Sequence, residues 1–265
     1  MTPVIVTEGS SPVILAFPHG GVEVPTEIWS ALNENGRRLA DTDWHIHRLY
    51  DGLLEGATCV QAAFHRYVVD ANRDPKGESL YPGKNTTGLC PLTDFDGNAI
   101  WEDGYRLDEA ETESRRREFH TPYHDALAGQ IARVKARHGC AVLYDCHSIR
   151  SRIPFLFDGI LPDFNIGTND QASCAETVQA SVLQDCAAAS AYRHVLNGRF
   201  KGGWTTRHYG DPDRNIHAIQ MELALSTYAS EAKPWGYDTE RADKLRPVLK
   251  KILENLEALA LGHLS

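Results

Sequence analysis

The sequence predicts an α/β layered fold, in which strands and helices alternate along the chain. Short apolar runs at residues 13–17, 58–63, 141–144 and 217–223 have the length and composition of strands, and longer stretches with helical spacing lie between several of them. Such alternation favours a sheet with helices packed against it. The chain contains no internal repeat, low-complexity tract or interdomain linker. We therefore expect residues 1–265 to form a single domain.

In the first half of the chain, polar residues follow the expected strands. The apolar run at 13–17 ends in a Pro-His-Gly-Gly turn, which places His19 at the end of a strand. Residues 45–54 have helical spacing, so Asp43 stands at or near a helix N-terminus. Residues 58–63 and 67–70 are β-like, and Pro75 discourages a helix after them. Asn72 and Arg73 are therefore expected just past a strand.

The second half begins with a long irregular segment and continues with further strands and helices. Residues 76–104 are rich in Gly, Pro, Asn, Thr and Asp and lack apolar periodicity, which is typical of a loop beside an active site. A helix is expected over about 107–138, with a break near Pro122, and the strand at 141–144 places His147 just past its end. We also expect a helix at 171–189, a strand at 193–196, a glycine-bounded loop at 201–210 and a closing helix at 239–261. Period-two alternation at 217–223 directs Glu222 away from the apolar face of its strand.

The composition argues against several classes of function. The 27 basic and 36 acidic residues give a formal net charge of −9, which repels nucleic acid and anionic membranes. A small anionic substrate would therefore need a local cationic pocket. The six cysteines form no C-x-x-C pair, and no early apolar run is long enough for a signal peptide or a membrane span, so we predict reduced thiols and a cytoplasmic protein. No G-x-S-x-G, phosphate-loop or G-x-G-x-x-G motif is present. The oligomeric state is not indicated.

Two histidines at strand ends indicate a metal site. His19 and His147 both follow short apolar strands, where ligands tend to bind in α/β sheets. Imidazole and carboxylate ligands suit zinc, and a catalytic zinc usually keeps three protein ligands and one open position. Asp43, just before a helix, and Glu23, four residues after His19, are both candidates for the carboxylate ligand. The alternative is that each histidine only satisfies backbone groups at a turn.

Glu222 and two arginines supply the remaining chemistry expected at such a site. A water activated by zinc needs a base to collect its proton, and Glu222 is the candidate. The alternative is a buried ion pair between Glu222 and Arg73 or Arg207. Arg73, next to Asn72, and Arg207, in the glycine-bounded loop, could each hold a carboxylate with a planar guanidinium fork. For each arginine, an internal salt bridge to a nearby aspartate is the alternative.

Three other features carry less weight. His120 and His124 have the i, i+4 spacing of helical zinc ligands, but a proline lies between them and the H-E-x-x-H glutamate is absent. We interpret them as structural, with His124 as a candidate pocket wall. Asp145 is a candidate acceptor that orients His147. Cys146 should point to the opposite face of an extended segment, which argues against a thiol nucleophile.

Six motifs, taken in order, resemble those of the N-formylglutamate amidohydrolase (deformylase) family. They cover nearly the whole chain, and their order and spacing make the resemblance specific although each motif alone is weak. The motifs are Pro18-His19-Gly20-Gly21, Asp41-Thr42-Asp43-Trp44, Val69-Asp70-Ala71-Asn72-Arg73-Asp74-Pro75, Asp145-Cys146-His147-Ser148, Gly202-Gly203 with Thr206-Arg207-His208-Tyr209-Gly210, and Gln220-Met221-Glu222-Leu223.

The resemblance implies a metal-dependent amidohydrolase that cleaves the linear amide of N-formyl-L-glutamate into formate and L-glutamate, in histidine degradation. It also implies a three-layer mixed sheet with helices on both faces, similar to the zinc carboxypeptidases. It assigns one Zn²⁺ to His19, Asp43 and His147, the catalytic base to Glu222, and substrate binding to Asn72, Arg73 and Arg207. The wider group has its carboxylate ligand three positions after the first histidine, where this chain has Val22. This departure leaves the choice between Asp43 and Glu23 open.

Two other functions are compatible with the same residues. One is a related zinc amidohydrolase that acts on another N-acyl amino acid or on a peptide C-terminus. The other is a non-catalytic protein that binds a dicarboxylate. Metal analysis and a comparison of substrates distinguish the three hypotheses.

Overall fold

The computed structural model describes residues 1–78, 83 and 85–264. Within them, seven strands form one mixed sheet in the order β1-β3-β2-β4-β7-β5-β6. The pairs β2–β3, β2–β4, β4–β7 and β5–β6 are parallel, whereas β1–β3 and β5–β7 are antiparallel. The strands are β1 (Val4–Thr7), β2 (Val13–Phe17), β3 (Thr58–Ala62), β4 (Ala141–Ile149), β5 (Phe164–Gly167), β6 (His194–Leu196) and β7 (Ile216–Ala224).

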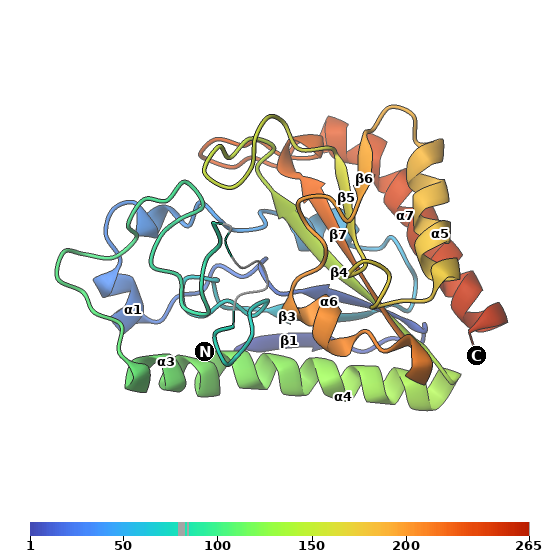
Figure 1. The fold of residues 1–265 in the computed structure, drawn as a ribbon, viewed down its shortest axis with the longest axis horizontal. Coiled ribbons are helices and arrows are strands. Elements are labelled where there is room, and N and C mark those ends of the chain that lie inside the picture. Colours follow the sequence, from blue (N-terminus) through green and yellow to red (C-terminus); the bar gives the residue numbers. More distant parts are fainter. Residues whose placement is uncertain (79–82, 84, 265) are drawn as a thin grey trace.

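Helices cover both faces of this sheet (Figure 1). The long helix α4 lies along one face, and α5 and α7 pack together against the other. The α-helices are α1 (Thr26–Ala31), α2 (Ile46–Tyr50), α3 (Glu109–Arg115), α4 (Thr121–His138), α5 (Glu176–Ala188), α6 (Trp204–Tyr209) and α7 (Thr239–His263). A π-helical turn, η2 (Arg116–His120), joins α3 to α4, and the 3-10 turns are η1 (Gly36–Arg38), η3 (Pro212–Arg214) and η4 (Leu225–Thr227). The predicted mixed α/β fold is confirmed, while the similarity to zinc carboxypeptidases and the single domain stay predictions.

The central strand β2 shows why this sequence forms a sheet covered on both sides. All five of its residues are buried. Val13, Leu15 and Phe17 belong to the hydrophobic cluster beneath α5 and α7, whereas Ile14 and Ala16 belong to the cluster beneath α4. A parallel strand buried on both faces needs a continuous apolar run rather than an alternating one. The run at 13–17 therefore predicts both the strand and the two layers of helices around it.

The strand predicted at 67–70 is wrong. This segment forms a turn, in which the backbone N–H of Val68 donates to the carbonyl of His65, and the N–H of Asp70 donates to the carbonyl of Leu89. Tyr67 and Val68 pack into the cluster beneath α4. The apolar residues thus reflect burial of a turn rather than pairing in the sheet, and composition does not separate these two cases.

Several predicted boundaries also change. Strand β4 continues to Ile149, so His147 lies within a strand instead of just past it, and the loop predicted at 201–210 contains helix α6. The helix predicted over 107–138 is not broken at Pro122, because the π-helical turn η2 runs directly into α4 and Pro122 comes just after it. Helix α5 begins at Glu176 rather than at 171. Sequence analysis did not identify β1, β5 or α1, which are all short.

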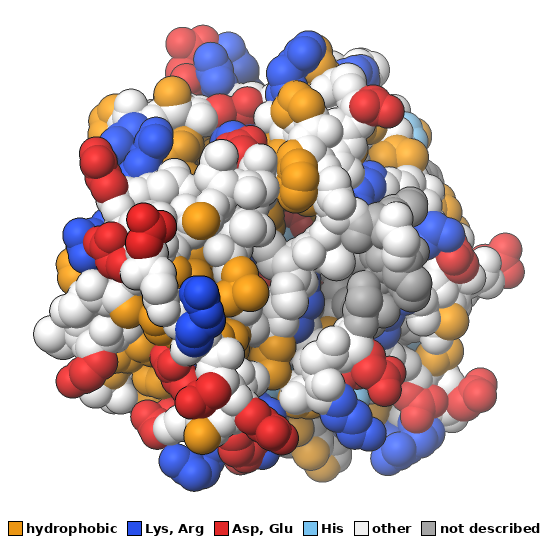
Figure 2. Space-filling model, turned by 60° about the vertical axis from the view of Figure 1, so that its left-hand side comes forward, with side chains coloured by type: hydrophobic (Ala, Val, Ile, Leu, Met, Phe, Trp, Pro, Cys, Tyr) orange, Lys and Arg blue, Asp and Glu red, His pale blue; other side chains and the backbone are white. Residues whose placement is uncertain are grey.

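The surface carries charges of both signs. On the face shown in Figure 2, the lysine and arginine side chains are interspersed with aspartate and glutamate. Such a face lacks the basic stripe expected of a nucleic-acid-binding protein. Among the described residues, no helix has both the length and the apolar character needed to cross a bilayer.

The packing of α7 against the sheet generates a test of the core. Leu249 lies on α7, is fully buried and belongs to the cluster beneath α5 and α7. We expect Leu249→Ala to lower the free energy of unfolding by about 3 kcal/mol, because the lost side chain leaves a cavity. The matched control is Leu261→Ala on the same helix, where the side chain is 55% exposed and the change should stay within about 0.5 kcal/mol. Urea unfolding of both variants measures the difference, and equal losses would contradict this packing.

Candidate functional site

Three potential metal ligands lie together at the carboxyl end of the central strands. The ligand atoms of His19, Asp43 and His147 all lie within 4.8 Å of one another, and the three side chains are buried. Asp43 Oδ2 is 3.1 Å from His147 Nδ1 and 3.9 Å from His19 Nδ1. Two imidazoles and one carboxylate form a donor set that fits zinc and leaves a position open for another ligand. The structure thus brings together the three residues predicted as metal ligands.

The parallel sheet positions these residues. His19 comes two residues after β2, which pairs in parallel with β4, the strand that contains His147. In the next parallel pair, His147 is aligned with Glu222 of β7. Asp43 lies on the segment before α2, where its backbone N–H donates to the carbonyl of His19, and its Oδ2 accepts from the N–H of Ser148. Residues far apart in sequence therefore meet because their strands are adjacent.

A further carboxylate faces the other ring nitrogen of each histidine. Nε2 of His19 is 2.6 Å from Asp70 Oδ1, and Nε2 of His147 is 3.1 Å from Asp145 Oδ1. Arg66 in turn forms a 2.6 Å ion pair with Asp70. At His19, the carboxylate hydrogen-bonded to Nε2 favours the tautomer whose Nδ1 lone pair is available for a metal ion. The sequence indicates Asp145 as a candidate acceptor for His147, but it carries no signal for Asp70 or Arg66.

The two imidazoles have opposite electrostatic environments. Burial, together with the nearby guanidinium of Arg66, lowers the pKa of His19 to about 4, which keeps this ring neutral. Burial also acts to lower the pKa of His147, but the surrounding carboxylates, above all Asp145, outweigh it and raise this pKa well above its usual value. Positive charge is therefore favoured at His147 when no cation shares the cluster.

Glu222 is also buried, and it lines the same pocket. Burial raises its pKa to about 8, and the carboxylates of Asp43 and Asp145 reinforce this effect, whereas His147 and Arg66 oppose it. One oxygen, Oε2, accepts a 3.0 Å hydrogen bond from Nε2 of Gln220. A carboxyl group that can take up a proton near neutral pH has the property required of a general base or acid.

Glu23, the other candidate for the third ligand, lies away from this cluster. Its side chain is exposed, and its backbone pairs with the segment after β3 through bonds to Ala63 and His65. The geometry therefore favours Asp43, although Glu23 is closer to His19 in sequence.

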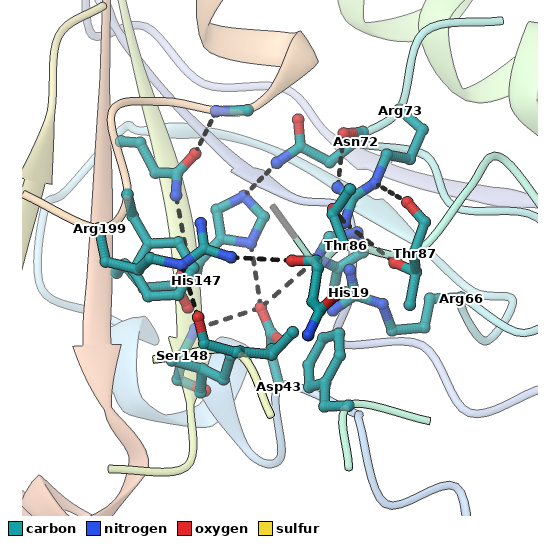
Figure 3. Close-up of a pocket in the computed structure, with 18 residues that line it drawn as sticks. His19, Asp43, Arg66, Asn72, Arg73, Thr86, Thr87, His147, Ser148 and Arg199 are labelled. Atoms are coloured by element: carbon teal, nitrogen blue, oxygen red, sulfur yellow. Dashed lines mark hydrogen bonds and ion pairs between the residues drawn. The ribbon is translucent and has the colours of Figure 1, made fainter. Parts of the chain in front are cut away.

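The pocket around the cluster contains polar and basic side chains (Figure 3). In the view of Figure 3, Arg199 lies on one side of the histidines, and Arg66 and Arg73 lie on the other. The described residues that line it are His19, Asp43, Arg66, Asn72, Arg73, Asn85, Thr86, Thr87, Phe95, His147, Ser148, Ile149, Leu156, Arg199, Phe200, Gly203, Gln220 and Glu222. A pocket with three guanidinium groups provides the local cationic surface that an acidic protein needs for an anionic ligand.

Of the predicted substrate-binding residues, Asn72 and Arg73 line the pocket, whereas Arg207 does not belong to its described lining. Asn72 Nδ2 lies 3.1 Å from His147 Nε2. Arg73 lines the pocket, but its guanidinium also bonds to Thr87 and lies 3.7 Å from Asp70, the internal salt bridge given as the alternative. Arg207 lies on α6, where its Nε donates to the carbonyl of Gly202, and it does not belong to the described lining of the pocket. Arg199 does line the pocket, although the sequence carries no signal for it.

His120 and His124 have contacts that hold the backbone, as expected, but His124, a candidate pocket wall, does not belong to the described lining of the pocket. Nε2 of His120 lies 3.1 Å from the carbonyl oxygen of Arg73, and Nε2 of His124 lies 2.7 Å from that of Ala71, so both rings hold the backbone around Asn72. Cys146 points into the core beneath α5 and α7, and burial raises its pKa well above the usual value. That thiol is poorly suited to act as a nucleophile.

Comparisons with known proteins agree on one family. Residues 11–229 match the family described as N-formylglutamate amidohydrolase. The N-formylglutamate deformylase of Pseudomonas aeruginosa is 47% identical over 251 residues, which cover 94% of each chain. The Pseudomonas putida protein of the same name is 44% identical over 95% of this chain and 94% of its own. The crystal structure of N-formylglutamate amidohydrolase from Ralstonia eutropha has the same fold, with a TM-score of 0.78 at 22% identity over 96% of this chain and 97% of that one.

The two carboxylates considered as the third ligand allow a matched test. We expect Asp43→Asn to weaken Zn²⁺ binding by more than the roughly 10- to 100-fold that follows the loss of an outer-shell partner. The reason is that a neutral amide replaces an anionic ligand within the cluster. Glu23→Gln should bind Zn²⁺ as the unmodified protein does. Competition titration with a chromophoric chelator measures both affinities, and the reverse ranking would assign the ligand to Glu23.

Proposed function

Because the chain belongs to the N-formylglutamate amidohydrolase family, we propose that it hydrolyses N-formyl-L-glutamate to formate and L-glutamate, as a step of histidine degradation. The observation that carries this proposal is the buried cluster of His19, Asp43 and His147, with Glu222 in the same pocket. The names of the relatives support the substrate, and the pocket's guanidinium groups support an anionic ligand.

A metal ion is part of the proposal. His19, Asp43 and His147 would hold it, and their two nitrogens and one oxygen favour zinc. When bound, a divalent ion of this kind polarises a carbonyl group and lowers the pKa of water. Nε2 of His19 is held by Asp70, and Nε2 of His147 lies 3.1 Å from both Nδ2 of Asn72 and Oδ1 of Asp145, so contacts on the far side of each ring orient the imidazoles.

Glu222 moves the proton in this proposal. In its ionised form it takes a proton from the water that attacks the formyl carbon and delivers that proton to the glutamate nitrogen as the C–N bond breaks. Burial raises its pKa to about 8, which favours the protonated form, whereas positive charge near His147 favours the ionised form. The two tendencies together suit a group that must both accept and donate a proton.

Arg73 and Arg199 are placed to hold the two carboxylates of the substrate. Both line the pocket, from different segments of the chain, and Figure 3 shows them on different sides of it. Arg199 Nε donates to the carbonyl of Leu156, and its Nη2 donates to the carbonyl of Asn85. Holding both carboxylates would fix the small formyl group against the catalytic residues, which lowers the entropic cost of reaction. Asn72 contributes a polar amide between Arg73 and His147.

The role of Glu222 is tested by an isosteric change. We expect Glu222→Gln to bind zinc normally and to release formate from N-formylglutamate roughly 10²- to 10⁴-fold more slowly, because a neutral amide cannot accept the proton. Formate assays and metal analysis of the same samples measure both quantities. Near-normal turnover would place the base elsewhere.

The same assay tests the substrate and the need for a metal. Removal of the metal by a chelator should abolish formate release, and added zinc should restore it. Faster turnover of N-acetylaspartate or of a short peptide would favour the related hydrolases. Binding of the dicarboxylate without turnover would favour a non-catalytic protein, and activity that survives complete metal removal would contradict the proposal.

Arg199 and Arg207 form a matched pair for the substrate-binding site. We expect Arg199→Ala to raise KM for N-formylglutamate by roughly 10-fold or more, because hydrogen bonds to a charged group are lost. Arg207→Ala should change KM much less, since that side chain lies outside the described lining of the pocket. Steady-state kinetics of both variants provide the measurement. A larger rise in KM for Arg207→Ala than for Arg199→Ala would support substrate binding by Arg207, as predicted from the sequence.

A further inference from the structure

Gln220 lies between the start of α6 and the carboxylate of Glu222. Its side chain is 3% exposed and projects from β7 on the same face as Glu222, two residues further along the strand. The backbone N–H of Gly203 donates a 2.7 Å hydrogen bond to Gln220 Oε1. Gln220 Nε2 donates a 3.0 Å hydrogen bond to Glu222 Oε2. The amide therefore connects a fixed backbone group to one oxygen of the carboxylate.

The orientation of this amide is determined by its first partner. A backbone N–H can only donate, so the atom that faces Gly203 must be the oxygen of the Gln220 side chain. The NH₂ group must then face Glu222. The bonding network thus settles which end of the amide meets the carboxylate, a choice that side-chain shape alone leaves open.

The backbone can supply this N–H only because residue 203 is a glycine. A Cβ atom at this position would lie 2.2 Å from Nδ2 of Asn72. Two residues later, the N–H of Thr205 donates to Oδ1 of Asn72. One short turn of backbone therefore orients the amides of both Asn72 and Gln220, and the missing side chain of Gly203 lets it approach closely enough.

We propose that Gln220 is a positioning residue for Glu222: by holding Oε2, it fixes the carboxylate so that Oε1 receives the proton of the attacking water. The inference rests on the proposed function, in which Glu222 is the base. No bond is made or broken at Gln220, and Gly203 acts only by orienting its amide. The effect of Gln220 therefore passes entirely through Glu222.

The test replaces the amide with a side chain of similar length that cannot donate. We expect Gln220→Met to lower kcat for N-formylglutamate by roughly 10-fold, since a charge-assisted hydrogen bond is lost, and to leave KM and zinc content within 2-fold. If Gln220→Met does not fold, Gln220→Asn replaces it in the test. This variant keeps an amide but is shorter by one methylene, so the amide cannot reach Glu222 and kcat should fall by a similar factor. The control is Gln130→Met on α4, whose side chain bonds to Glu8 and Arg133, outside the described lining of the pocket, and should leave both constants unchanged.

A double-mutant cycle separates positioning from other effects. In the Glu222→Gln background, Gln220→Met should cause no further loss, because the group through which it acts is already changed. An equal loss in both backgrounds, a rise in KM alone, or an unchanged kcat would each overturn the inference.

A crystal structure of Gln220→Met gives a readout that does not depend on turnover. The Glu222 side chain should occupy a different rotamer or more than one. An unchanged carboxylate position would overturn the inference even if N-formylglutamate proved not to be the substrate. Absence of turnover in the unmodified protein would instead contradict the proposed function.

Discussion

The burial of several carboxylates in one place is the constraint on which the rest of the site depends. Four of them lie around His19 and His147, those of Asp43, Asp70, Asp145 and Glu222. A buried anion is costly unless it is paired and hydrogen-bonded. Arg66 compensates one of them directly, and the other carboxylates raise the pKa of His147, which favours a proton among them. A divalent cation would take over the role of that proton. The buried carboxylates, which destabilise the fold when they are uncompensated, would therefore give the site its affinity for metal.

Much of this site could be predicted from the sequence because parallel strands fix where their ends lie. An apolar run that stops at a Pro-His-Gly-Gly turn can place His19 at only one edge of the sheet, and period-two alternation gives the direction of Glu222. Asp70 and Arg66 could not be assigned in the same way. They belong to a buried turn whose apolar residues read as a strand, and only the folded backbone brings Asp70 to the outer nitrogen of His19.

The two arginines show a different limit of sequence analysis. The glycines around Arg207 indicate a loop whose arginine could hold a carboxylate, but the segment forms α6, and Arg207 Nε donates to the carbonyl of Gly202. Arg199 has no local signature, because its place in the pocket follows from the pairing of β6 with β5 at the edge of the sheet. The position of a long flexible side chain depends on tertiary packing, whereas the position of a strand end depends mainly on local pattern.

The π-helical turn η2 has a consequence for how the chain can vary. Within the segment from α3 to α4, it inserts an extra residue per turn just before Thr121, and His120 and His124 on either side of its end both reach the backbone around Asn72. Each helical residue rotates its successors by roughly 100° about the axis. A single-residue deletion here would turn one imidazole away while the other stayed in place. Insertions and deletions should therefore be excluded at this junction, where the rotation separates the two imidazoles and also turns the buried face of α4 away from the sheet.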